Sequence, residues 1–335
     1  MVIVVAPVYI SEISRKESRG MLGSGVQLGI TIGILLSYVL GMYCTWRTLA
    51  LLSALVAVVQ LVQNLRIKDT PRYLLMSGRK PEALQALAWL RGPVADIDDE
   101  CRDMEENLPD KNDVFTLSEL TQPQLLAPLK VSIGLVVFQQ LTGINAVMFF
   151  TVSIFESAGY ENGQLATVVV GLVQVVFTFL ACFLMDKAGR RLLLLVAGLG
   201  MTVSCLLLGY YYHALANKAG DGLSWLALAS VVCYIIAFSL GWGPIPMLVM
   251  SEIFPVKARG AASAISTSLS WTASFILTNQ FAALQATFGA YGAFWLFAFF
   301  CCLGTVFVFK MVPETKGKSL EDIELYFLGR AALSY

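Results

Sequence analysis

Long runs of apolar residues alternate along this chain with short polar breaks. A helix needs about 20 consecutive apolar residues to cross the hydrocarbon core of a membrane, so each run of that length predicts one span. Eight runs are long enough, at residues 21–42, 47–66, 129–150, 164–185, 192–212, 224–250, 258–282 and 291–311. The apolar opening 1–10 reaches only half a span. The pattern predicts an all-α polytopic membrane protein.

One long polar segment, residues 67–128, interrupts the spans. Apolar positions at helical spacing inside it predict a short helix over 81–91. The acidic stretch 96–113 is typical of a solvated, partly helical linker. We therefore expect a cytoplasmic linker between two bundles, with a complete six-helix bundle over 129–312 and a cytoplasmic tail over 313–335.

A short pattern occurs twice in the chain. Ser-Glu-Ile, five further residues and Arg-Gly occupy 11–20 and again 251–260, 240 positions apart. Residues 69–72 (Asp-Thr-Pro-Arg) and 314–316 (Glu-Thr-Lys) form a second pair at a similar separation. Repetition at this scale indicates two similar halves. The offset predicts about 112 further residues before Met1, enough for three helices and most of a fourth.

On this interpretation the intact design has six plus six spans. Residues 1–66 then form a partial N-terminal bundle, with the end of a fourth helix followed by the fifth and sixth. A signal peptide is the alternative interpretation of the opening. It is disfavoured because there is no basic n-region or small-residue cleavage site, and Pro7 interrupts the apolar run.

The basic residues predict an orientation, because Lys and Arg resist translocation and mark cytoplasmic loops. With residues 11–20 inside, only Arg47 and Lys218 among the 23 basic residues fall on the outer side. This distribution predicts an integral membrane protein with both termini in the cytoplasm. It leaves open a plasma membrane or an endosomal or lysosomal membrane.

Composition narrows the class of protein. A chain with 57% hydrophobic residues, 14% charged residues and a mean hydropathy of +0.71 is too apolar for an ordinary soluble domain. The seven cysteines lack metal-ligand spacing, and the lone His213 excludes a His-rich metal site. The formal net charge of zero gives no information about partners. We expect no metal, no cofactor and no nucleic-acid partner.

Neutral polar side chains occupy the middles of the spans. The amides are Gln27, Gln139, Gln140, Asn145 and Gln174. Serines, a threonine and Trp271 cluster over 268–274. Such donors and acceptors beside aromatic rings suit a polyhydroxyl ligand, although polar side chains also join helices in membranes without binding anything. The scarcity of ionisable groups there argues against an intramembrane protease, and no nucleophile–base pair or nucleotide loop indicates an enzyme.

Glycine and proline mark two breaks in these spans. On a regular helix Asn145 would lie about 120° from Gln139, so the two would not face one ligand. Gly143 offers a place to unwind, and discontinuous helices beside a substrate are typical of transporters. Two prolines within 241–246 remove backbone donors and predict a second break.

Charged residues recur at the predicted cytoplasmic ends of the helices. Glu12 and Arg19 have the same spacing as Glu252 and Arg259, and residues 186–191 add a further charged cluster. Charges at helix ends are usually topology signals and nothing more. Their repetition favours ion pairs that close the inner face, each worth about 1 kcal/mol or less when exposed. A few such pairs bias a two-state equilibrium of a few kcal/mol.

In several stretches the chain resembles the sugar porter branch of the major facilitator superfamily, the facilitative hexose transporters. The stretches run in family order at 7–20, 26–38, 69–75, 138–150, 185–194, 241–260 and 312–324. The sequence of these stretches is most similar to that of intracellular, class III-like members and of insect trehalose transporters. The resemblance implies alternating access, in which two bundles rock around a sugar site at the membrane midplane.

The resemblance also implies roles for particular residues. The implied sugar contacts are Gln27, Gln139, Gln140, Asn145 and Trp271, with Gln174 where the family has Asn or Gln. The implied inner-face salt-bridge network comprises Glu12, Arg19, Arg72, Asp186, Arg190, Glu252 and Arg259.

Four positions depart from the pattern that the family usually shows. Met247 stands where Trp usually follows Gly-Pro-Ile-Pro, and Phe149 and Phe150 replace frequent tyrosines. Ser270 stands where Asn often precedes Trp271. These changes remove an aromatic wall and two hydroxyls, so they disfavour glucose itself but not a sugar-like ligand.

Two hypotheses about function follow. The first is transport of a hexose or related sugar by alternating access. The second is a non-transporting truncated isoform or incomplete gene model that at most binds sugar or associates with full-length carriers. The sequence leaves open which sugar is bound, the oligomeric state, and whether transport is passive or coupled to protons.

Overall fold

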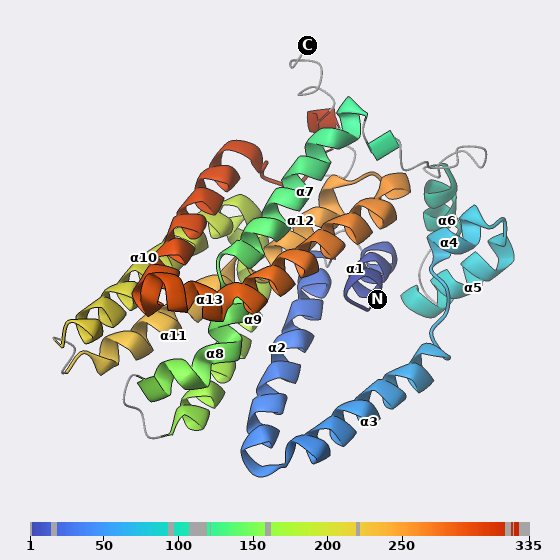
Figure 1. Cartoon of the computed structure of the whole chain (residues 1–335). Helices are drawn as coiled ribbons and strands as arrows, with labels where there is room; N and C mark the ends of the chain where they lie inside the picture. Colours follow the sequence, from blue (N-terminus) through green and yellow to red (C-terminus); the bar gives the residue numbers. More distant parts are fainter. Residues whose placement is uncertain are drawn as a thin grey trace.

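The computed structural model describes residues 2–14, 19–92, 97–106, 119–120, 122–157, 162–218, 222–318, 323 and 325–327. Within these ranges the chain is built almost entirely from helices (Figure 1). Seven of the described helical segments are long and apolar enough to cross a membrane. The fold is therefore an all-α polytopic one, as predicted.

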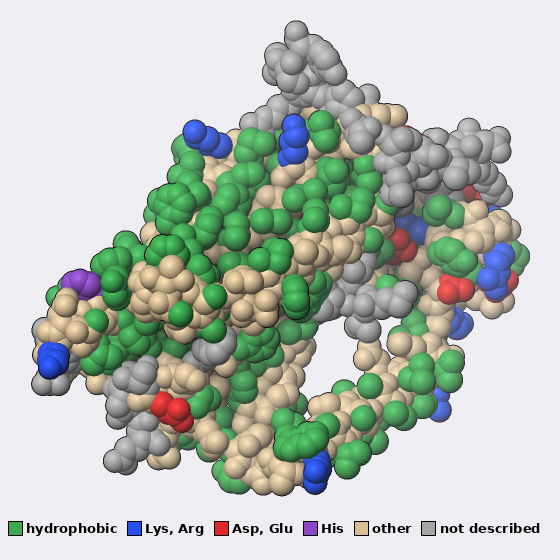
Figure 2. Space-filling view, viewed as in Figure 1, with side chains coloured by type: hydrophobic (Ala, Val, Ile, Leu, Met, Phe, Trp, Pro, Cys, Tyr) green, Lys and Arg blue, Asp and Glu red, His purple; other side chains and the backbone are tan. Residues whose placement is uncertain are grey.

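The first part of the chain forms three helices. They are α1 (Val2–Ile13), α2 (Arg19–Tyr43) and α3 (Trp46–Asn64). Helix α2 packs along the second bundle, mainly against α9. Helix α3 diverges from α2, leaving the open gap visible in Figure 2, and no residue of α3 is buried.

The linker folds into a small helical unit beside α1 (Figure 1). Its helices are α4 (Pro71–Met76), α5 (Lys80–Arg91) and α6 (Ile97–Glu106). Thr70 caps α4 by accepting the N–H of Tyr73, and Pro71 occupies the first helical position, where its missing N–H costs nothing. Leu74, Leu87 and Cys101 are part of a separate apolar core. The predicted helix over 81–91 is confirmed by α5, and part of the acidic stretch 96–113 is helical as predicted.

The second bundle contains the remaining helices. They are α7 (Pro123–Leu141), α8 (Ile144–Ser157), α9 (Gly163–Ala188), α10 (Arg190–Ala216), α11 (Ser224–Leu240), α12 (Ile245–Ile253) and α13 (Val256–Met311). These helices enclose the main apolar core, which includes the fully buried Trp242.

The eight predicted spans correspond to seven helical segments in the structure. The last two predicted spans, 258–282 and 291–311, both lie in α13. Gly289 kinks α13 between them with φ 72° and ψ 165°, values that are not helical. A glycine can adopt this left-handed φ without steric cost, so the helix changes direction there without a loop.

Candidate functional site

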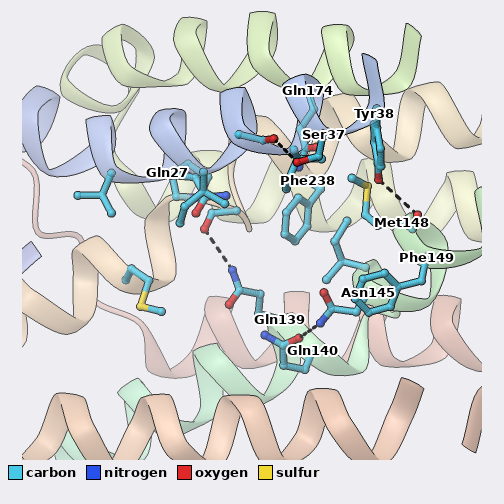
Figure 3. Close-up of a pocket in the computed structure, with 18 of the residues that line it drawn as sticks. Gln27, Ser37, Tyr38, Gln139, Gln140, Asn145, Met148, Phe149, Gln174 and Phe238 are labelled. Atoms are coloured by element: carbon cyan, nitrogen blue, oxygen red, sulfur yellow. Dashed lines mark hydrogen bonds between the residues drawn. The ribbon is translucent and has the colours of Figure 1, made fainter. Parts of the chain in front are cut away.

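A cavity of about 830 Å³ lies between α2 and the second bundle (Figure 3). Helices α7, α8, α9, α11, α12 and α13, with the break before α12, contribute the remaining walls. All the residues predicted as sugar contacts line it, namely Gln27, Gln139, Gln140, Asn145, Gln174 and Trp271. The side chains that line the cavity, among the described residues, are all uncharged. Such a cavity suits a neutral ligand that forms hydrogen bonds.

A break after α7 brings Asn145 to the cavity. Gly143 has φ +86°, and α8 begins at the next residue. A Cβ on Gly143 would lie 2.6 Å from Cδ2 of Phe297, so glycine is required here for both conformation and space. The predicted unwinding at Gly143 is confirmed.

The redirected helix joins two amides in one hydrogen-bonded chain. Nδ2 of Asn145 donates to Oε1 of Gln140 over 2.6 Å and to Oγ of Ser274 over 2.7 Å. Nε2 of Gln140 in turn donates to Oγ of Ser270 over 2.9 Å. Hydroxyls of α13 therefore orient amides of α7 and α8. Ser270 has a positioning contact at the place where the resemblance led us to expect an asparagine.

The second break, between α11 and α12, positions Gln139. Nε2 of Gln139 donates to the carbonyl oxygens of Trp242 and Gly243, at 2.6 and 3.1 Å. These carbonyls are free to accept because the helix is interrupted over 241–244, which confirms the predicted break. The Nε2 group of Gln139 thus already donates to the protein, and its Oε1 is the atom that can accept a hydrogen bond from a ligand hydroxyl.

Gln174 differs from the other amides of the cavity. It is only 3% exposed, and its Oε1 has no hydrogen-bond partner among the described residues. A buried acceptor without a partner costs free energy, because it has lost its hydrogen bonds to water. A ligand hydroxyl that donates to this oxygen would remove that cost.

The cavity also contains residues that sequence reasoning did not assign to the site. The further polar ones are Ser37, Tyr38, Gln164, Thr167 and Ser251. Helical spacing was the available signal for Tyr38, since eleven residues after Gln27 are close to three full turns. Met247 and Phe149, two of the departures from the family pattern, also line the cavity. The side chain of Phe150 lies outside the described residues.

A charged cluster, which we call the Arg190 cluster, lies where α9, α10 and α12 meet. Arg190 pairs with Asp186 at 3.1 Å and with Glu252 at 3.4 Å. Arg190 also donates to the carbonyl oxygen of Met185 and is only 6% exposed. The structure thus brings together three of the residues predicted for the inner-face network.

The segment after α13 joins the same cluster. Oγ1 of Thr315 donates to Oε2 of Glu252 over 2.7 Å. The carboxylate of Glu314 accepts the backbone N–H groups of Arg190 and Arg191 at 2.9 and 3.1 Å, and so caps the start of α10. Gly189 has φ +92°, and a Cβ there would lie 2.7 Å from Glu314. Sequence reasoning recognised the Glu-Thr-Lys repeat but assigned it no contact.

The first half repeats the threonine contact. Oγ1 of Thr70 donates to Oε2 of Glu12 over 2.6 Å, as Thr315 does to Glu252. Two further bonds join α1 to the linker, from Tyr9 to the carbonyl of Lys68 and from Arg91 to the carbonyl of Ile13.

The structure also describes two of the remaining residues predicted for the network. Arg259 is 3% exposed and donates to the carbonyl oxygen of Phe254. Arg72 lies half-buried in the first turn of α4. The side chain of Arg19 lies outside the described residues.

Comparison with known proteins gives consistent matches. The family described as "Sugar (and other) transporter" matches residues 1–327. The facilitated trehalose transporter Tret1 of Drosophila pseudoobscura pseudoobscura is 43% identical over 329 residues, which are 97% of this chain and 38% of the relative. Tret1 of Culex quinquefasciatus is also 43% identical, over 97% of this chain and 64% of the relative. The chain thus spans less than two thirds of the length of these relatives.

Solved structures with the same fold include those of XylE. The proton:xylose symporter XylE bound to 6-bromo-6-deoxy-D-glucose has a TM-score of 0.82 and 28% identity, covering 97% of this chain and 70% of XylE. The inward open conformation of XylE from E. coli has a TM-score of 0.71 and 27% identity, covering 96% and 68%. The likeness is greater to the sugar-bound structure.

Proposed function

This chain belongs to the sugar transporter family of the major facilitator superfamily, and from that premise we propose that it binds a hexose or related sugar and serves its transport across a membrane. One observation carries the proposal. Amides from α2 and from α7, α8 and α9 converge on a single cavity between the two parts of the chain (Figure 3). A site shared by two bundles is the arrangement that alternating access requires.

The chemistry of the cavity favours a polyhydroxyl ligand. A side-chain amide carries two donors and an acceptor, and where the donors are already bonded, as in Gln139 and Asn145, the oxygen can still accept from a sugar hydroxyl. Trp271 and Phe149 are 55% and 68% exposed, so their rings are available to pack on the apolar face of a sugar. The names of the relatives make trehalose the first sugar to test, with glucose beside it.

The Arg190 cluster is proposed as the inner gate. Its closure holds α10 and α12 together, and the lower likeness to the inward open conformation of XylE, with a TM-score of 0.71 against 0.82 for the sugar-bound structure, supports a closed inner side. Separation of the cluster would accompany opening to the other side, as a two-state equilibrium requires. With the orientation derived from the basic residues, this gate and both termini face the cytoplasm.

Ligand-induced thermal stabilisation in detergent tests the binding site. Trehalose or glucose should raise the melting temperature of the wild-type chain, because a ligand that binds only the folded state stabilises it. Replacing Gln139 and Gln140 together by Ala should abolish this rise. Gln63→Ala, the same change at an exposed position of α3, is the matched control. Unchanged stabilisation in the double variant would refute the assignment.

A second candidate function is a chain that binds sugar or associates with longer carriers without transporting by itself. The observation that favours it is the uncovered α3, which has no buried residue. Uptake by the purified chain in liposomes separates the two candidates. Saturable uptake supports the transporter, whereas sugar binding without uptake supports the second candidate.

A further inference from the structure

The end of the cavity opposite the Arg190 cluster is bridged by Tyr38. Helix α2 begins near the cluster, where Oγ of Ser24 donates to the sulfur of Met185. Gln27 and Tyr38 lie toward opposite ends of the cavity (Figure 3), about 16 Å apart along the helix at 1.5 Å per residue. The hydroxyl of Tyr38 donates to the carbonyl oxygen of Met148 on α8 over 3.4 Å. This bond joins the first part of the chain to the second.

A glycine on the second bundle makes room for the Tyr38 ring. A Cβ on Gly171 of α9 would lie 3.1 Å from Cδ2 of Tyr38 and 3.3 Å from Cδ1 of Leu35. Contacts that short are tighter than ordinary van der Waals packing. The ring therefore occupies a slot that exists because residue 171 has no side chain, and the hydroxyl is aimed from that slot at α8.

Helix α8 connects this contact to the proposed sugar site. It is a short helix, Ile144–Ser157, that starts directly after the break at Gly143. Asn145 and Met148 are three residues apart on it and so lie on neighbouring positions of one face. A displacement of α8 that adjusts Asn145 to a ligand would also move the acceptor carbonyl of Met148.

The length of the bond indicates which way that displacement acts. Hydrogen bonds between oxygens are shortest and strongest near 2.7–2.8 Å, and the 3.4 Å bond is well short of its best geometry. Small movements of α8 toward α2 would strengthen it. Phe149, the residue after Met148, lines the cavity toward the same end as Tyr38 (Figure 3) and carries no hydroxyl. Tyr38 therefore supplies the hydroxyl from the facing helix.

We propose that Tyr38 is a positioning residue that draws α8 onto α2 and closes this end of the cavity over a bound sugar. The proposal rests on the function proposed above. Its distinguishing consequence is kinetic. Removing the hydroxyl speeds release of the sugar far more than it slows entry, because the bond tightens only once the sugar is held.

Stopped-flow tryptophan fluorescence with trehalose and with glucose tests this, since Trp271 lines the cavity. Tyr38→Phe should raise the dissociation rate about fivefold, the effect of losing one neutral hydrogen bond. The association rate should change by less than about twofold. Gly171→Ala should act in the same direction, because its Cβ displaces the Tyr38 ring.

Tyr43→Phe is the matched control, since Tyr43 lies at the end of α2, is 83% exposed and does not line the cavity. The melting temperature without sugar should be the same for the wild type and Tyr38→Phe, which separates positioning from general destabilisation. If the wild type binds sugar and Tyr38→Phe releases it at the wild-type rate, the role proposed for Tyr38 is overturned while the proposed function stands. If the wild type binds neither sugar, the proposed function fails and the inference fails with it.

Discussion

Thr315 donates a 2.7 Å hydrogen bond to the carboxylate of Glu252. The threonine follows α13 and the glutamate lies in the last turn of α12, so the bond fastens the chain after α13 to the Arg190 cluster. In the first half Thr70 donates to Glu12 over 2.6 Å. In each half, therefore, the threonine of one repeated pattern donates a hydrogen bond to the glutamate of the other repeated pattern.

Thr315→Val should destabilise the chain by about 1–3 kcal/mol, because it removes the donor and leaves a largely buried carboxylate oxygen without it. The side chains have nearly the same shape, so packing changes little. The measurement is thermal unfolding in detergent. Thr287→Val is the control, since Thr287 is exposed and bonds only within its own helix. Equal melting temperatures for both variants would contradict the prediction.

Arg190→Ala should destabilise more strongly, by about 3–5 kcal/mol, because it removes a cation that pairs with the largely buried carboxylate of Glu252. A double-mutant cycle with Glu252→Ala should show coupling of the two changes. Additive losses would mean that the two side chains do not interact in solution.

The sequence predicted the helix breaks better than the contacts across them. Glycine and proline act on their own backbone, so Gly143 and residues 241–246 marked both breaks without knowledge of the fold. The series of hydrogen bonds from Asn145 through Gln140 to Ser270 depends on how α13 packs against α7, which no local pattern encodes.

The charged residues illustrate the same limit. Their repetition favoured ion pairs at the inner face but did not say which residues pair. In the structure Glu252 accepts from Arg190 and Thr315, which come from other segments. The kink at Gly289 was also hidden, because a short gap between two apolar runs predicts a loop as readily as a bent helix.

Gly143→Ala should abolish sugar-induced stabilisation and lower the melting temperature by several degrees. The Cβ would lie 2.6 Å from Phe297, and φ +86° is unfavourable for alanine. Gly25→Ala is the control, because a Cβ there meets nothing within 4 Å and alanine favours a helix. A Gly143→Ala protein that is stabilised by sugar like the wild type would show that the break does not position Asn145.

Cys101 in the linker helices should react slowly with iodoacetamide at neutral pH. It is 1% exposed, and burial raises the pKa of its thiol above the usual 9.0. The unfolded chain releases this proton more easily than the folded one. The neutral, buried thiol therefore contributes its full share to folding stability below about pH 9, and this contribution is lost as the pH rises above that value. Mass spectrometry of the labelled peptides should show Cys44, which is only half-buried, labelled before Cys101. Faster labelling of Cys101 would contradict its burial.

Gln174→Leu should change stability and ligand response in opposite directions. Leucine has a similar volume and removes a buried oxygen that lacks a partner among the described residues, so the unliganded melting temperature should rise. The same change deletes an acceptor that a sugar hydroxyl would use, so the rise in melting temperature on adding trehalose or glucose should shrink. Stability given up at a binding site is the usual cost of keeping polar atoms ready for a ligand. If Gln174 only joined helices, the substitution would lower the unliganded melting temperature and leave the sugar response unchanged.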